Sequence, residues 1–145
     1  MTPDTLLLSL RECSLSDWYA FPGDHRCPHD AWVEAVTISE PRSGDRHEKR
    51  GVEIRIRLLG AYHDGIIEFT YKRVQSYSLL APGVPGGHGD WLRDEVEDRD
   101  GSILHTVLLA NGRFQIEARD VEYRWTALPD NSVARIDGAD PKPNS

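Results

Sequence analysis

Hydrophobic and polar residues alternate most regularly between Trp91 and Trp125. The dipeptides Asp100-Gly101 and Asn111-Gly112 interrupt this alternation. Such dipeptides between alternating runs are strong signals of β-hairpins, because their residues suit turns with positive φ. We therefore predict antiparallel strands on both sides of each dipeptide.

The face that each side chain takes follows from the turns, because successive side chains point to opposite faces of a sheet. Two-residue loops at both dipeptides put Leu109 opposite Phe114 and His105 opposite Ala118. A third turn at Arg119-Asp120 would add a fourth strand. The predicted buried face then carries Leu92, Asp94, Val96, Ile103, His105, Val107, Leu109, Phe114, Ile116, Ala118, Val121, Tyr123 and Trp125. Trp91 points outward in this register, beside Glu95 and Glu97.

The preceding part of the chain shows the same pattern. Residues 51–62 alternate, and Asp64-Gly65 is a hairpin signal that would put Leu58 opposite Tyr71. Further strands are expected at residues 31–40, at residues 74–80 and near Leu6 to Leu10, and a short helix can begin at Ser16.

Seven or eight antiparallel strands with little helix predict an all-β protein, either a two-sheet sandwich or a partly open barrel. The pattern does not choose between these two architectures, although aromatic residues on both inward faces favour packed sheets. Residues 1–128 would form a single domain. Residues 129–145 contain no aromatic residue and are expected to be a mobile tail.

Composition narrows the classes of partner. The 145 residues carry a formal net charge of −7, which argues against nucleic acid because phosphate binding needs a basic surface. No stretch has the length and apolarity of a membrane span, and no targeting segment is visible. Two cysteines are too few for a disulfide framework, so we expect a cytoplasmic protein with reduced thiols.

Asp94 and His105 are unusual residues for the predicted apolar face, where they lie diagonally on neighbouring strands. A buried carboxylate costs free energy unless it is hydrogen-bonded. Three arrangements remain open: the pair satisfies its own polar groups and only stabilises the core, it binds a ligand or catalyses, or a bulge turns Asp94 to water. Arg73, predicted at an inward strand end, either reaches out to water along its aliphatic stem or is a partner of Asp94.

Two loops contain polar residues that could form a site. Residues 24–30 include His25, Cys27 and His29, which are zinc ligand types, but their spacing matches no common zinc pattern, so we predict a surface loop and no metal. Residues 81–90 are rich in glycine and proline without the Lys-Ser/Thr ending of a phosphate loop. We predict an exposed connection there and no cofactor, with His88 and Asp90 as site candidates because functional groups often lie on loops.

Two functions fit these observations. The first is a non-enzymatic module that binds another protein through an edge strand or loops, with Trp91 as an anchor; an inhibitor or immunity-type protein would be of this kind. The second is a small-molecule-binding or enzymatic β-barrel whose interior site contains Asp94 and His105, as polar contacts or as an acid–base pair. No motif of a known catalytic class is present, which favours the first. The oligomeric state is left open.

Overall fold

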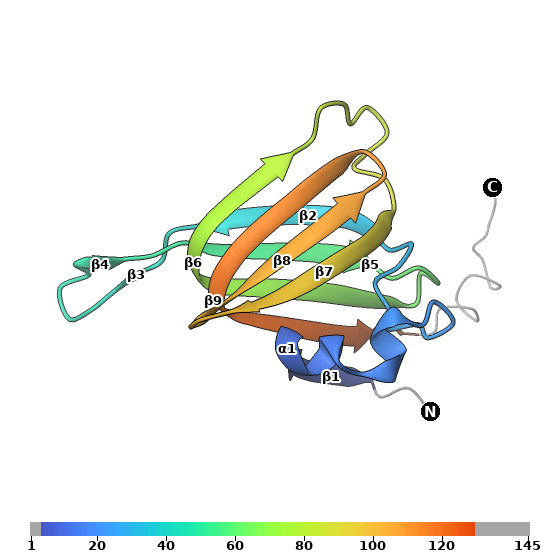
Figure 1. The fold of residues 1–145 in the computed structure, drawn as a ribbon, viewed down its shortest axis with the longest axis horizontal. Coiled ribbons are helices and arrows are strands. Elements are labelled where there is room, and N and C mark those ends of the chain that lie inside the picture. Colours follow the sequence, from blue (N-terminus) through green and yellow to red (C-terminus); the bar gives the residue numbers. More distant parts are fainter. Residues whose placement is uncertain (1–3, 130–145) are drawn as a thin grey trace.

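The computed structural model describes residues 4–129, which form mainly one antiparallel sheet (Figure 1). The strand order in this seven-stranded sheet is β2-β5-β6-β9-β8-β7, and β1 also pairs with β9. The elements in chain order are β1 (Thr5–Ser9), α1 (Leu10–Ser14), the 3₁₀ helix η1 (Asp17–Ala20), β2 (Trp32–Ser39), β3 (Arg42–Ser43), β4 (Lys49–Arg50), β5 (Glu53–Leu59), β6 (Gly65–Leu80), β7 (Trp91–Arg99), β8 (Ser102–Leu109) and β9 (Gly112–Ala127).

The prediction of an antiparallel all-β protein with little helix is confirmed. The main sheet is not closed into a barrel, because its terminal strands β2 and β7 do not pair; a single bridge joins Trp32 of β2 to Asp90, just before β7. The sheet is also continuous, since β6 and β9 pair along nearly their whole length. Phe69 on β6 nevertheless stacks on Trp91 of β7, with ring centroids 5.1 Å apart. The sheet therefore curves over its own aromatic core.

The predicted hairpin at Asp100-Gly101 is confirmed in register: Asp94 lies opposite Val107, Val96 opposite His105 and Asp98 opposite Ile103. Gly101 takes the positive φ of 79° that its turn requires. The register shifts between Trp91 and Arg93, so that Trp91 pairs with Leu109 and is fully buried. The prediction that Trp91 points outward is therefore wrong, because a bulge reverses the face of the residue that precedes it.

The second hairpin turns one step earlier than predicted, at Ala110-Asn111. Leu109 lies opposite Gly112 and His105 lies opposite Ile116, a shift of two residues that leaves every side chain on its predicted face. Two contacts favour this turn. The backbone N–H groups of Ala110 and Asn111 donate to carbonyls of the preceding long loop, and a Cβ at Gly112 would lie 2.7 Å from the carbonyl oxygen of Leu80.

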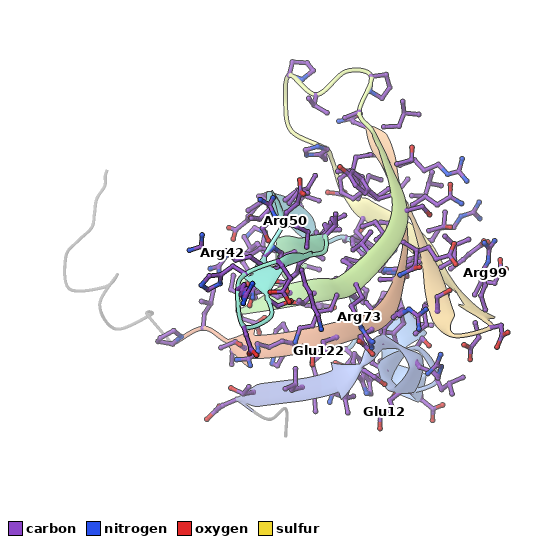
Figure 2. The ribbon with its side chains drawn as sticks, turned by 90° about the vertical axis from the view of Figure 1, so that its left-hand side faces the viewer. Glu12, Arg42, Arg50, Arg73, Arg99 and Glu122 are labelled. Carbon is purple, nitrogen blue, oxygen red and sulfur yellow. The ribbon has the colours of Figure 1, made fainter. Side chains whose placement is uncertain are left out.

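The predicted turn at Arg119-Asp120 is absent, because β9 continues through it to Ala127. The buried positions shift here from Ala118 to Val121, with two exposed residues between them. On the neighbouring strand Arg73 has a positive φ of 53°, and its Nη2 lies 2.5 Å from Asp120 Oδ2. Figure 2 shows β6 curving strongly near Arg73. Two consecutive exposed residues within one bent strand give the same sequence pattern as a turn between two strands.

The β5–β6 hairpin has a longer loop than predicted. Leu58 lies opposite Ile67 instead of Tyr71, a shift of four residues that again preserves the faces. The backbone N–H of Gly60 donates to the carbonyl of Gly65, which closes the loop. Gly65 begins β6 with no room for a Cβ, because the ring of Trp125 occupies that space. This close approach, not a turn, requires the glycine.

The short N-terminal elements cover one end of the curved sheet. Ser9 ends β1 and caps α1, and a capping box joins its side chain and backbone to Glu12. The expected strand near Leu6 to Leu10 and the helix beginning at Ser16 are both present, the second as η1. None of the helices in residues 4–129 is long and apolar enough to cross a membrane. The predicted tail falls almost entirely on residues 130–145, which lie outside the described residues.

Candidate functional site

Asp94 and His105 form a hydrogen-bonded pair on the buried face. His105 Nε2 lies 2.6 Å from Asp94 Oδ2, and two tyrosines extend the pair into a chain of four side chains. Tyr71 Oη lies 2.7 Å from His105 Nδ1, and Tyr19 donates to Asp94 Oδ2 over 2.5 Å. Of the three arrangements left open by the sequence, the structure therefore shows the acid and the imidazole hydrogen-bonded to each other and no bulge that turns Asp94 to water. Arg73, the other suggested partner of Asp94, instead pairs with Asp120.

One arrangement of protons satisfies all these contacts. With Tyr71 as the donor to Nδ1 of His105, the Nε2–H of the imidazole donates to Asp94. Burial, followed by the nearby charge of Asp94, raises the pKa of both Tyr19 and Tyr71 well above the ordinary value. Both phenols therefore stay protonated and remain donors.

The two central residues differ in their access to solvent. The side chain of His105 is fully buried, whereas that of Asp94 is 8% exposed. Both protein donors contact Oδ2 of Asp94; within residues 4–129 Oδ1 accepts no hydrogen bond, yet it is not among the fully enclosed atoms. In this series of four hydrogen-bonded side chains, the atom that a ligand can reach is therefore Oδ1 of Asp94.

A pocket of about 410 Å³ lies over this carboxylate. Its walls come from the end of α1, from η1, from the loop before β2 and from β7. The residues that line it are Ser14, Leu15, Tyr19, Ala20, Cys27, Pro28, His29, Trp91, Arg93, Asp94 and Val96. The capping box at Ser9 and Glu12 fixes α1, and thereby positions Ser14 and Leu15 on the wall.

The segment with His25, Cys27 and His29 is distributed among different partners. Cys27 is buried and its thiol donates to the carbonyl of Tyr19 over 2.9 Å, which holds that tyrosine beside the pocket. His25 Nδ1 lies 2.5 Å from Asp64 Oδ2, and His29 Nδ1 contacts the carbonyl of Leu92. Across residues 4–129 no three His, Cys, Asp or Glu side chains are grouped in a way that could hold a metal ion.

The other candidates from the long loop serve the fold through their backbones. His88 and Asp90 accept hydrogen bonds from Asn111 and Ala110 through their carbonyl oxygens, and the ring of His88 packs against Phe114. Neither residue lines the pocket at Asp94. Trp91 is among the residues around the pocket but is fully buried, so it cannot be an exposed interface anchor.

A second candidate surface lies at the opposite terminal strand of the sheet. Beyond the bridge from Trp32 to Asp90, strand β2 pairs only with β5, and it leads into the β3–β4 hairpin (residues 40–51), which projects beyond the sheet (Figure 1). Every residue from 37 to 51 is exposed. Figure 2 shows Arg42 and Arg50 on this hairpin. We call the unpaired side of residues 34–39 the β2 edge.

The chain was compared with known protein families, with curated proteins and with solved structures, and no match was found.

Sequence reasoning found Asp94 and His105 but missed the two tyrosines that complete the chain. Tyr19 is 75 residues from Asp94 and lies on a 3₁₀ helix, so no periodicity or spacing connects the two. The wall of the pocket did leave a signal, because Ser9 and Glu12 have the spacing of a capping box and predict the helix α1.

Proposed function

We propose that this protein is a non-enzymatic binding module that takes up an extended segment of another protein along the β2 edge. An extended peptide that adds a strand to a sheet gains main-chain hydrogen bonds from the exposed backbone, and alternate side chains give specificity. The proposal keeps the protein-binding function expected from the sequence and moves its surface from Trp91 to β2.

The two terminal strands of the sheet differ in how they are protected. Natural proteins protect free edges with charged residues, because unpaired backbone groups attract other strands. Six of the nine residues of β7 are charged. The eight residues of β2 include only one charged residue, Glu34, whose carboxylate is already paired with Arg57. The β2 edge therefore lacks the usual protection.

Ile38 is the observation that carries the proposal. It lies opposite Ile54 in the β2–β5 register, on the face that is buried elsewhere in the sheet. Ile54 is fully buried, yet Ile38 remains 44% exposed. The difference arises because Ile54 has a strand on each side and Ile38 has one on a single side. A strand added to β2 would cover Ile38.

The β3–β4 hairpin indicates the charge of the partner. Arg42 lies opposite Arg50, and Ser43 lies opposite Lys49. Like charges at directly opposed positions destabilise a sheet, and a two-stranded ribbon is marginal by itself. Within the described part of the chain, neither these cations nor Arg46 takes part in an ion pair. The hairpin also carries Glu40, Asp45 and Glu48, so its four Arg and Lys residues exceed its acids by one. Acidic residues of a partner would relieve the repulsion between the opposed cations, so we propose that the partner carries an acidic segment next to the strand that covers β2.

A random peptide library displayed on phage tests the proposal without knowledge of the natural partner. The full chain should enrich peptides in which β-branched or aromatic residues alternate and acidic residues follow at one end. The variant Ile38→Lys places a charge on the β2 edge and should weaken binding of these peptides at least tenfold. A tenfold change in affinity corresponds to about 1.4 kcal/mol of binding free energy. The control Leu80→Lys changes an exposed apolar residue on β6, 57% exposed against 44% for Ile38, and should leave binding unchanged.

Two results would overturn the proposal. One is peptide binding that Ile38→Lys and Leu80→Lys affect equally, because the peptides would then occupy another surface. The other is a dimer, measured by light scattering at the concentrations of the selection, that Ile38→Lys dissociates. In that case a second copy of the chain would be the occupant of the β2 edge.

A further inference from the structure

We propose that the pocket at Asp94 binds a small molecule through a primary ammonium group that contacts Oδ1 of Asp94. This site lies on β7, α1 and η1, at the opposite terminal strand from the β2 edge. The inference is therefore independent of the proposed protein-binding function.

Within residues 4–129 the buried carboxylate of Asp94 forms no ion pair with a Lys or Arg side chain. Its side chain is more than nine-tenths buried, and within residues 4–129 its single ion-pairing neighbour is His105. The imidazole donates to Asp94 as a neutral group when its other nitrogen accepts from Tyr71. A buried charge is costly unless an opposite charge or hydrogen bonds compensate it. A ligand cation at Oδ1 would supply the missing charge.

The carboxylate is also held in place before any ligand arrives. Tyr19 and His105 both donate to Oδ2, which fixes the plane of the carboxylate and leaves Oδ1 directed away from these donors. Tyr19 is itself held by the thiol of Cys27 at its carbonyl. A group whose orientation is fixed in advance loses little conformational entropy on binding, which is how preorganised sites gain affinity.

The remaining lining suits a hydrocarbon body. Leu15, Ala20, Pro28 and Val96 present aliphatic atoms to the pocket. Arg93 also lines it and is exposed, so it can meet an anionic group at the outer end of a ligand. A simple amine and an amino acid share the ammonium chemistry, and Arg93 would distinguish them.

Titrations followed by ¹H–¹⁵N correlation spectra test the site. The probes are benzylamine, which is protonated at neutral pH, benzyl alcohol as its neutral analogue, and phenylalanine as the amino acid. Benzylamine should shift amides of η1 and β7 in a saturable way, and benzyl alcohol should bind at least about tenfold more weakly, because its neutral hydroxyl can donate to the carboxylate but brings no opposite charge. Tighter binding of phenylalanine than of benzylamine would assign Arg93 the carboxylate.

Three variants locate the binding. Asp94→Asn keeps the shape and removes the charge, so it should weaken benzylamine binding by a factor of roughly ten or more. Ala20→Trp fills the exposed rim of the pocket without touching Asp94, and should have the same effect even if Asp94→Asn fails to fold. Asp100→Asn removes an acidic residue at the exposed β7–β8 turn and should have none.

Equal binding of benzylamine and benzyl alcohol would overturn the inference. The absence of saturable shifts at millimolar benzylamine would overturn it as well. Shifts that Ala20→Trp leaves unchanged would place the amine elsewhere and have the same consequence.

Discussion

Replacing Tyr71 by phenylalanine tests whether the buried polar chain is formed as described. The ring of Tyr71 is fully buried, and its hydroxyl contacts Nδ1 of His105 over 2.7 Å. Tyr71→Phe keeps the ring and removes the hydroxyl, so the fully buried nitrogen of His105 loses its donor. The perturbation is thus a single hydrogen bond in a site that water does not reach.

The expected loss follows from leaving a buried acceptor unsatisfied. Such a group costs about 1–3 kcal/mol of stability, more than the net gain of an ordinary hydrogen bond. In the background of His105→Leu the hydroxyl has no acceptor, so the same Tyr71→Phe substitution should cost nothing or stabilise. The double-mutant cycle should therefore show a coupling of about 1 kcal/mol or more.

Urea denaturation at neutral pH measures both quantities. Tyr71→Phe should lower the midpoint with an unchanged slope, because the surface exposed on unfolding is the same. Tyr77→Phe, at a residue that is 46% exposed on the same strand, is the matched control and should leave the midpoint unchanged. A cost of Tyr71→Phe that equals that of Tyr77→Phe, or a cycle without coupling, would refute the hydrogen-bonded chain.

Two further predictions concern the buried thiols and phenols. Burial raises the pKa of Cys13 above its ordinary value of 9.0, and the pKa of Tyr19 is raised too. The folded protein then keeps protons that the unfolded chain releases, so stability should fall as the pH rises above about 9, and a urea midpoint that stays constant up to about pH 10.5 would contradict this. Burial also raises the pKa of Cys27, so a colorimetric thiol reagent should label both cysteines slowly in the folded protein and rapidly in urea; rapid labelling without urea would show that they are accessible.

The sequence predicted the faces of the strands better than their pairing. The β8–β9 and β5–β6 hairpins are shifted by two and four residues from the prediction, and the apolar inward side chains of residues 54–58, 67–71, 103–109 and 114–118 kept their face, whereas Arg73 did not. Side chains alternate between the two faces of a strand, so the hydrophobic pattern determines which face each side chain takes. A shift of the pairing by two or four residues keeps the same faces, so the pattern does not determine the register. Contacts from distant segments selected the register, such as the close approach of Leu80 to Gly112.

Local irregularities were the main source of error. A bulge reversed Trp91, and a bend at Arg119-Asp120 was interpreted as a turn. Both interrupt the alternation within a strand, and sequence alone does not distinguish an interruption inside a strand from the end of one. The second error also affected the predicted architecture, because β9 is one unbroken strand and joins its neighbours into a single sheet.

The two central residues of the candidate site could be predicted from the sequence, but the pocket around them could not. Asp94 and His105 could be found because polar residues on an apolar face need partners. The pocket could not be found, because its walls come from segments more than 60 residues apart along the chain, such as Tyr19 and Asp94. The exposure of Ile38 also required the structure, since it depends on β2 being the last strand of the sheet.

Amide hydrogen exchange along β2 tests the proposed function most directly. In the free protein the amides of residues 34–39 that point away from β5 should exchange rapidly, in alternation with slowly exchanging amides that donate to β5. A peptide selected by the full chain should slow the rapid set and leave β7 unchanged. Uniformly slow exchange in the free protein, or rapid exchange that persists in the complex, would contradict the claim that β2 accepts a partner strand.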